Sequence, residues 1–248
     1  MNIESATEPL IRIEHLYKHF GELQVLEDFN MVLNPEENLV VLGRSGAGKS
    51  VLIKCIIGLL KPDSGDIVVF GQHIPELDHD ALDRIRVRIG FLFQGNALYD
   101  SMTVRENLEF PLRRQWIGHT QKEVDNLVME ALDNVSLRHT MDMMPSELSG
   151  GMLKRIALAR TMILKPDIIL YDEPTTGLDP VTAREIDQLI VKLQRKYHTA
   201  SIIISHDMNC VRNTADRVIL LLDGKAYISG TYTELAQSKD SNIRQFFE

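Results

Sequence analysis

A glycine-rich loop near the start of the chain limits the possible folds more than any other feature. Residues 43–50 read Gly-Arg-Ser-Gly-Ala-Gly-Lys-Ser, after the apolar run 39–42 and before the apolar segment 51–57. This order predicts a buried strand, a phosphate-binding loop and a helix. The glycines allow backbone N–H groups to converge on phosphate oxygens at the positive end of a helix. The loop therefore predicts an α/β protein that binds a nucleoside triphosphate.

The side chains of this loop have distinct expected roles. Lys49 brings a mobile positive charge to the outer phosphates, and Ser50 offers a hydroxyl oxygen to Mg²⁺, which prefers hard oxygen ligands. A glycine-rich turn that ends in Lys-Ser by coincidence is the alternative, but the flanking strand and helix argue against it. The other residues expected to line the nucleotide here are Gly43, Arg44, Ser45, Gly46, Ala47, Gly48 and Val51.

Short apolar runs recur along the chain. Segments of helical length separate them, which is the pattern of a mainly parallel sheet with helices packed on its faces. The runs span residues 39–42, 89–93, 168–171, 201–205 and 218–222. We therefore expect a single α/β domain over residues 1–248, built on this sheet.

Two parts of the chain depart from that pattern. Residues 10–16, 24–33 and 66–70 alternate between apolar and polar, which predicts an antiparallel β subdomain beside the main sheet. Between Asn96 and Lys165 no strong strand pattern occurs and helical spacing dominates, so an inserted helical subdomain is expected over about 96–165. Residues 235–248 are expected to form a C-terminal tail.

Polar side chains follow three of the predicted parallel strands. Asp172 and Glu173 end the run 168–171, so the sheet's carboxyl edge would present them to a ligand. Asp172 is placed to hold Mg²⁺ through water, and Glu173 to orient the attacking water, although a solvated acidic turn is the alternative. Gln94 and His206 also follow strands; each alone would be weak evidence, because such a histidine is more often a capping or surface residue.

Composition excludes several classes of protein. The net charge of -8 and the pI near 5.5 disfavour a nucleic-acid partner, which requires an excess of Lys and Arg. Cys55 and Cys210 lack metal-ligand spacing and are expected to be reduced core residues, with a disulfide as the alternative. No apolar stretch approaches the roughly 20 residues that span a bilayer, and the N-terminus carries Glu4 and Glu8 where an export signal would be basic. We expect a cytosolic protein.

A second glycine motif indicates a family. Ser149-Gly150-Gly151 precedes a predicted helix, Met152–Leu164, whose N-terminus could hold another anion. In isolation, a Gly-Gly turn with a serine cap would be the simpler interpretation. Together with the phosphate loop and the paired acids, however, the chain resembles the nucleotide-binding subunit of ABC transporters over nearly its whole length. The resemblance implies a P-loop NTPase of RecA-like fold, ATP hydrolysis, and a head-to-tail homodimer that clamps ATP between 43–50 of one copy and 149–151 of the other.

The resemblance also assigns roles by position. It implies that Phe20 stacks on adenine, although Tyr17 lies nearby and a flat ring is all that stacking needs. Gln94 would be a Mg²⁺ ligand and would link the nucleotide to a membrane partner, Asp179 would lie in the loop that crosses between subunits, and His206 would sense the γ-phosphate.

Met152 stands where glutamine is usual in the family, so any polar contact of that glutamine is missing or replaced by packing. This signature, the segment 93–108 and the ending 243–247 resemble the Mla/Mce branch, which moves phospholipids or other lipids between the membranes of diderm bacteria. The resemblance implies integral-membrane permease subunits, a small cytosolic regulatory partner, a periplasmic Mce-type lipid-binding protein and a place on the cytoplasmic face of the inner membrane. Gln245 and Phe246 would tie the tail to a neighbouring subunit or form an amphipathic plug.

Other functions stay open at this point. The same ATPase could serve lipoprotein release, small-solute transport or cell-division machinery. A protein that acts on DNA or ribosomes, or a switch that binds ATP without hydrolysing it, is a third hypothesis. The negative net charge and the lack of a long coiled-coil insert argue against a protein that acts on nucleic acid. The presence of Glu173 and His206 argues against a switch that cannot hydrolyse ATP.

Overall fold

The computed structural model describes residues 8–113 and 120–247. Its centre is a six-stranded sheet in the order β10-β9-β3-β8-β7-β6, in which only the edge strand β10 is antiparallel to its neighbour. The expected mainly parallel α/β sheet is therefore confirmed. The strands are β3 (Asn38–Leu42), β6 (Ile89–Leu92), β7 (Ile168–Asp172), β8 (Ala200–Ser205), β9 (Arg217–Leu222) and β10 (Lys225–Gly230).

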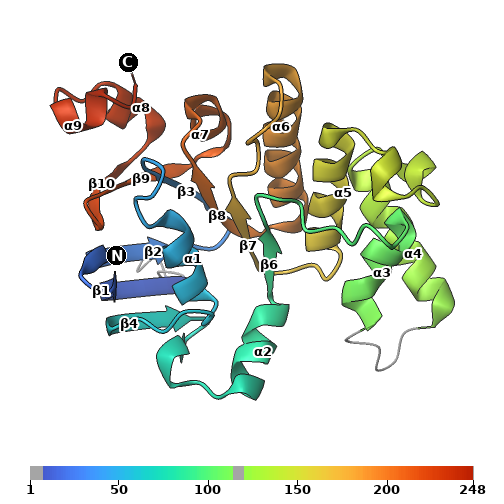
Figure 1. Cartoon of the computed structure of the whole chain (residues 1–248), viewed down its shortest axis with the longest axis horizontal. Helices are drawn as coiled ribbons and strands as arrows, with labels where there is room; N and C mark the ends of the chain where they lie inside the picture. The colour runs from blue at the N-terminus through green and yellow to red at the C-terminus, as the bar shows by residue number, and fades with distance from the viewer. Residues whose placement is uncertain (1–7, 114–119, 248) are drawn as a thin grey trace, which may run out of the picture.

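A second sheet of four antiparallel strands lies beside the first (Figure 1). The alternating segments of the sequence form it, as expected, because each strand buries one face and exposes the other. β5 is too short to have shown an alternating pattern. The strands are β1 (Ile11–Phe20), β2 (Leu23–Leu33), β4 (Ser64–Val69) and β5 (Gln72–His73).

The parallel sheet separates two hydrophobic cores. Val40 and Leu42 face a core shared with the helices on one side, whereas Leu39 and Val41 face a core shared with the antiparallel sheet. Strands buried on both faces lack an alternating pattern, which explains the continuous apolar runs in the sequence. The helices that pack against this sheet include α1 (Lys49–Ile56), α2 (His79–Val87), α6 (Pro180–Tyr197) and α7 (Met208–Thr214).

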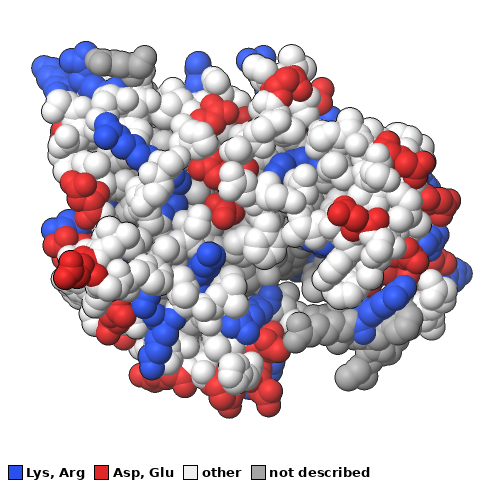
Figure 2. All heavy atoms as spheres, viewed as in Figure 1, with Lys and Arg blue, Asp and Glu red and all other residues white. Residues whose placement is uncertain are grey.

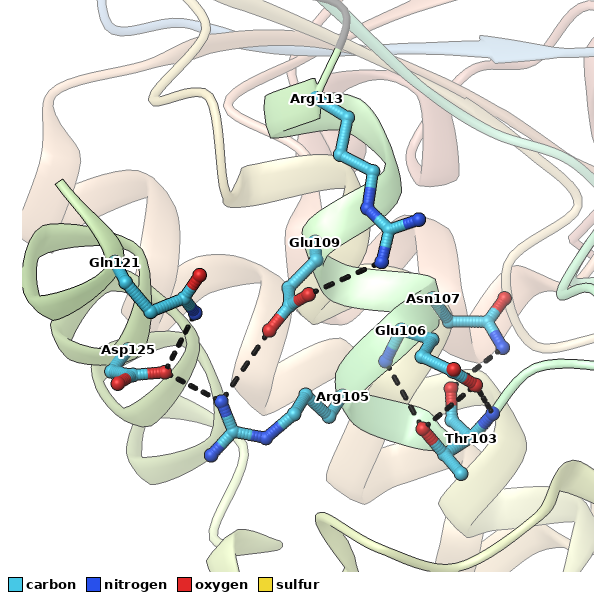
Figure 3. A network of polar contacts seen from close by, with 8 residues as sticks. All are labelled: Thr103, Arg105, Glu106, Asn107, Glu109, Arg113, Gln121 and Asp125. Atoms are coloured by element: carbon cyan, nitrogen blue, oxygen red, sulfur yellow. Dashed lines mark hydrogen bonds and ion pairs between the residues drawn. The ribbon is translucent and has the colours of Figure 1, made fainter. Parts of the chain in front are cut away.

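A group of helices forms one end of the molecule (Figure 1). It contains α3 (Val104–Arg113), α4 (Gln121–Asn134) and α5 (Gly150–Met162), and the described part of residues 96–165 contains no strand. A polar contact joins the first two helices, because Arg105 Nη1 of α3 donates to Asp125 of α4 at 2.6 Å (Figure 3). The same nitrogen also donates to Glu109 within α3 at 3.4 Å. Residues 114–119 of the expected insert lie outside the described residues.

The remaining helices are short. α8 (Tyr232–Ala236) and α9 (Ser241–Arg244) form the C-terminal tail, and one-turn 3₁₀ helices occur at Ile74–Glu76, Arg138–Thr140 and Pro145–Glu147. Cys55 and Cys210 are free and buried, as expected for core residues, and burial raises the pKa of the Cys55 thiol to about 11. No helix in residues 8–113 or 120–247 is long and apolar enough to cross a bilayer. The expectation about an export signal stays a prediction, because Glu4, one of the two acids on which it rests, lies outside the described residues.

Candidate nucleotide-binding site

The phosphate loop joins β3 to α1 as the sequence predicts. Gly46 and Gly48 have φ values of +81° and +100°, a region that residues with a Cβ rarely adopt. A Cβ on Gly48 would lie 2.7 Å from a Val25 side-chain carbon, and a Cβ on Gly43 would lie 2.8 Å from the Leu221 carbonyl oxygen. Glycine is therefore required at these positions by backbone angle, close packing or both. No side chain caps α1, so its first N–H groups stay available for an anion.

Lys49 lies buried under this loop. Its Nζ donates to the carbonyl oxygens of Gly43 at 2.7 Å and Arg44 at 3.0 Å, and it lies 3.9 Å from Glu173 Oε1. Burial lowers the pKa of the Lys49 ammonium, while Glu173 and Asp172 act in the opposite direction. The ammonium is thus held where it would meet a phosphate bound in the loop.

Ser50 and Asp172 bring two oxygen donors together from distant parts of the chain. Ser50 Oγ donates to the Asp172 carboxylate at 3.3 and 3.4 Å. Asp172 ends β7, and burial raises the pKa of its carboxyl group while the Ser50 hydroxyl lowers it. A hydroxyl beside a carboxylate at the end of a phosphate loop suits Mg²⁺, which prefers oxygen ligands.

Glu173 follows directly, in a conformation that turns its side chain toward the loop. Its φ is +51°, which is uncommon for a residue with a Cβ, and its N–H donates to the Ile204 carbonyl of β8 at 3.0 Å. Thr176 Oγ1 donates to Glu173 Oε2 at 3.2 Å, and His206 Nδ1 lies 2.8 Å from the same oxygen. The side chain of Glu173 is 12% exposed and that of His206 is 53% exposed. The histidine therefore faces the open side of the site.

The structure brings five predicted residues together at the carboxyl edge of the parallel sheet. Lys49 and His206 contact Glu173, and Ser50 contacts Asp172, the chain neighbour of Glu173. Sequence reasoning missed Thr176, Val25 and Leu221. The Glu-x-x-Thr spacing was a readable signal for Thr176, but only the tertiary fold places Val25 and Leu221 against the loop.

Gln94 lies at the same edge of the sheet but outside this group of contacts. It is exposed, two residues beyond the end of β6, and β6 pairs with the β7 that carries Asp172. Its backbone carbonyl accepts a hydrogen bond from the Lys154 ammonium at 3.0 Å. The sheet therefore presents Gln94 beside the acids, and its assignment as a Mg²⁺ ligand stays a prediction.

The signature residues begin a separate helix. Ser149 is the N-cap of α5, and its Oγ accepts a hydrogen bond from Met152 N–H at 3.3 Å. Ser149 and Gly150 are exposed, whereas Met152 packs against the adjoining core. Among the described residues, no hydrogen bond or ion pair joins this segment to the phosphate loop of the same chain, and Figure 1 shows α5 well apart from α1.

The start of α6 lies against the signature segment. Asp179 caps this helix by accepting from the N–H groups of Val181 at 3.0 Å and Thr182 at 3.1 Å. A Cβ on Gly151 would lie 2.7 Å from the Thr182 methyl carbon, so the two helix starts touch. Asp179 has a clear capping role, and its part in a crossing loop stays a prediction.

Phe20 ends β1 with a ring that is 48% exposed, whereas Tyr17 is only partly exposed within the strand. The residues just after Phe20, Leu23 to Val25, share a hollow with the phosphate-loop residues Arg44–Ala47. Phe20 pairs with Leu23, which lines that hollow, and its role as the ring that would meet a base stays a prediction. The tail also reaches the loop, because Arg44 donates a hydrogen bond to Gln245.

Comparisons with known proteins agree with this site. Residues 26–176 match the family described as ABC transporter. The intermembrane phospholipid transport system ATP-binding protein MlaF of Haemophilus influenzae is 37% identical over 242 residues, which cover 96% of this chain and 90% of that protein. The probable ribonucleotide transport ATP-binding protein mkl of Mycobacterium bovis is 39% identical over 239 residues, covering 95% and 66%.

A solved structure supports the same conclusion. The dimeric post-hydrolysis state of an ATP-binding cassette, bound to ADP and phosphate, shares 32% identity and a TM-score of 0.81, with 90% of this chain and 98% of that chain covered. The fold is therefore that of an ABC ATPase cassette. Sequence, geometry and both kinds of comparison converge, and the chain belongs to the ABC transporter ATPase family.

Proposed function

We propose that this chain is the ATP-binding and ATP-hydrolysing subunit of an ABC transporter that moves phospholipids or related lipids across a bacterial cell envelope. The observation that carries the proposal is the cluster of Lys49, Asp172, Glu173 and His206 beside the phosphate loop. These four side chains lie close together and supply, in that order, a positive charge for the phosphates, a carboxylate for the metal, a base for the attacking water and a sensor of the γ-phosphate.

Each side chain has a role in this mechanism. The loop amides and Lys49 hold the phosphates of ATP, and Ser50 with Asp172 would hold Mg²⁺, which would neutralise phosphate charge when bound. Glu173 orients the attacking water and accepts its proton. His206 keeps the Glu173 carboxylate in place through the 2.8 Å contact and senses the γ-phosphate. Gln94, which follows the neighbouring strand β6, would add a further oxygen ligand to that metal site.

Two copies of the chain would share each ATP. The signature segment 149–151 starts a helix with an exposed serine at its positive end, which suits an anion. It lies away from the phosphate loop of its own chain, and the related cassette bound to ADP and phosphate is a dimer. We therefore infer a homodimer in which the signature of one copy closes on the nucleotide held by the other, with Asp179 at the crossing.

A large groove on the surface supports the proposal of a membrane partner. It has a volume of about 630 Å³ and is lined by α2, β6, α3 and α5, and Figure 2 shows the surface hollowed between α2 and the helical end. Phe93, Tyr99 and Phe110 are each more than 40% exposed in it. Exposed aromatic side chains gathered in one groove are typical of a protein-binding site. This groove would receive a cytosolic helix of the permease, which would hold the chain on the cytoplasmic face of the inner membrane.

The similarity to MlaF over almost the whole chain favours a lipid cargo and the wider Mla/Mce assembly. That assembly would add a small cytosolic regulatory partner and a periplasmic Mce-type protein. The name of the mycobacterial relative makes ribonucleotides a second candidate cargo. On the face drawn in Figure 2, Lys and Arg alternate with Asp and Glu rather than forming one basic surface, and this favours a partner other than nucleic acid.

The decisive experiment is to purify the native complex from membranes and identify its subunits and bound small molecules by mass spectrometry. We expect a permease that co-purifies, phospholipid in the complex, and ATP hydrolysis that stops when the nucleotide is trapped by vanadate. If the complex carried nucleotides or peptides instead of lipid, the proposed cargo would be wrong and the bound molecule would take its place. A chain that purifies without any membrane protein would contradict the transporter assignment.

A further inference from the structure

The segment that leaves β6 has an unusual backbone. Asn96 and Ala97 have φ values of +61° and +54°, so two consecutive residues with a Cβ occupy the left-handed region. Such a conformation persists only where the surroundings hold it. The segment begins at Gln94, which would face the nucleotide, and ends at Tyr99, which lines the groove proposed for the permease.

The surroundings that hold this segment are side chains of α5. Lys154 Nζ donates to the Gln94 carbonyl oxygen at 3.0 Å. Arg160 Nη1 donates to the Ala97 carbonyl oxygen at 2.8 Å. The helix that begins at the signature therefore holds the Gln94 segment at two points.

The other end of the segment is held by α3. Asn107 is fully buried; its Oδ1 accepts from Tyr99 N–H at 2.8 Å, and its Nδ2 donates to the carbonyl oxygens of Tyr99 and Met102 at 3.0 Å each. A carboxamide with this many backbone partners fixes the loop that it contacts. The segment is therefore held by hydrogen bonds at both ends. A displacement of Tyr99 in the groove would move Gln94 as well.

Lys154 is the most unusual member of this set. It is 2% exposed, and among the residues that the structure describes no carboxylate forms an ion pair with it. Burial lowers the pKa of its ammonium group. An apolar side chain would fill the same space without the cost of removing a charge from water. Packing alone therefore does not account for a lysine at this position.

We propose that Lys154 is a positioning residue that couples the Gln94 segment to the signature helix. Its ammonium keeps the Gln94 backbone at a fixed distance from α5, and the N-terminus of that rigid helix carries Ser149–Gly151. A nucleotide contact made by Gln94 would then turn the signature toward the partner's nucleotide. The inference rests on the proposed ATPase function, because Gln94 and Ser149 take their roles from it.

The test replaces Lys154 by methionine, which keeps an unbranched side chain and removes the ammonium. We expect the free energy of unfolding to stay equal or rise and nucleotide affinity to change by less than about twofold. Amide hydrogen exchange of residues 94–97 should accelerate in the protein without nucleotide, and kcat should fall by about tenfold, a typical size for a coupling residue. Lys154→Arg retains a donor and should restore most of the rate. Lys192→Met, an exposed lysine on α6, should match wild type.

A double variant distinguishes coupling from a merely structural role. If Lys154 acts by placing Gln94, then Lys154→Met should have little further effect on kcat in a Gln94→Ala background. If the two substitutions reduced kcat independently, so that their effects multiplied, the inference would be overturned. Unchanged amide hydrogen exchange of residues 94–97 in Lys154→Met would also overturn it, and so would a loss of stability that parallels the loss of rate. Wild-type hydrolysis in Glu173→Gln would instead contradict the proposed chemistry, so the two failures can be told apart.

Discussion

At the scale of single residues, Glu173 is the centre of the proposed chemistry. Lys49, Thr176 and His206 surround its carboxylate, and a left-handed backbone turns it toward the phosphate loop. Such crowding is expected where a carboxylate must meet one water molecule in one orientation. The contact with His206 has a further consequence, because a change at either residue alters the placement of the other.

Replacing Glu173 by glutamine tests its role directly. Glutamine keeps the shape and the contact with His206 but cannot accept a proton, so turnover should fall by about 100-fold or more. ATP binding should persist, and dimers closed on ATP should accumulate because the step that opens them is blocked. Turnover is measured by phosphate release. The dimers are detected by size-exclusion chromatography followed by light scattering. Glu76→Gln changes an exposed acid that is distant from Glu173 in the sequence, and as the control it should leave turnover unchanged. Unchanged turnover in Glu173→Gln would remove this residue from the mechanism.

The sequence was sufficient to find the residues of the site, but not all of their contacts. Asp172 and Glu173 were readable because they directly follow the unmistakable apolar run 168–171, and Lys49 because it belongs to the glycine-rich loop that follows β3. The 2.8 Å contact of His206 with Glu173 was not, because no local pattern fixes how two neighbouring strands align. The Lys154–Gln94 contact was also missed, since a lysine within a helix normally predicts a solvent-exposed position.

At the scale of elements, α3 and α4 share one apolar core, and polar contacts add to it where the two helices meet. Arg105 on α3 bonds Asp125 on α4, and Gln121 donates to the same carboxylate at 3.3 Å (Figure 3). The Arg105 hydrogen bond lowers the pKa of the Asp125 carboxyl group, with a smaller contribution from Gln121. Because the folded pKa is depressed, this pair stabilises the fold above the unfolded pKa of about 3.9 and loses its effect as the pH falls.

Asp125→Asn should therefore lower the urea midpoint of unfolding at pH 7. The difference from wild type should shrink as the pH falls through 4, because the wild-type carboxylate becomes protonated and the two proteins become alike. Asp142→Asn removes the same charge from an exposed position and should change the midpoint less at every pH. Urea titrations followed by circular dichroism at several pH values supply the measurement. A difference that stays constant with pH would show that Asp125 acts through packing.

Most elements of the parallel sheet were predictable, and the exceptions have physical causes. β10 was not expected because it is an edge strand with alternating exposure rather than a strand buried on both faces. α2 has only two buried residues, Leu82 and Ile85, so its helical pattern is weak. The helical insert was readable from its lack of strand patterns, but the placement of α5 against the Gln94 segment depends on tertiary contacts.

At the scale of the whole molecule, the proposed mechanism divides each ATP site between two copies, because the phosphate loop and the signature segment of one chain do not meet. The phosphate loop lies over the central sheet, whereas Ser149 begins a helix at the helical end (Figure 1). A second copy, related by a two-fold axis, would bring each half to its complement. In the proposed mechanism, ATP would then bridge the copies and hydrolysis would remove the bridging γ-phosphate, so binding energy would be converted into opening and closing at the groove proposed for the permease.

Mixing two inactive variants tests this arrangement. Lys49→Ala removes the charge under the phosphate loop, and Ser149→Arg places a bulky cation where the signature would meet the partner's γ-phosphate. Each variant alone should have little activity, since both of its sites are defective. A mixed dimer has one site with both defects and one intact site, made from the loop of the Ser149→Arg copy and the signature of the Lys49→Ala copy. An equal mixture should thus recover about a quarter of the wild-type rate if sites act independently in a two-fold dimer.

The recovery should appear in phosphate-release assays after the subunits have been allowed to exchange in the reconstituted complex. A mixture of Lys49→Ala with the double variant Lys49→Ala/Ser149→Arg is the matched control, because no intact site can form in it. Activity in the first mixture alone would require that residues from two copies act on one nucleotide. If both mixtures stayed equally inactive while mixed dimers were present, the loop and the signature would have to serve the same copy, and the shared-site mechanism would be wrong.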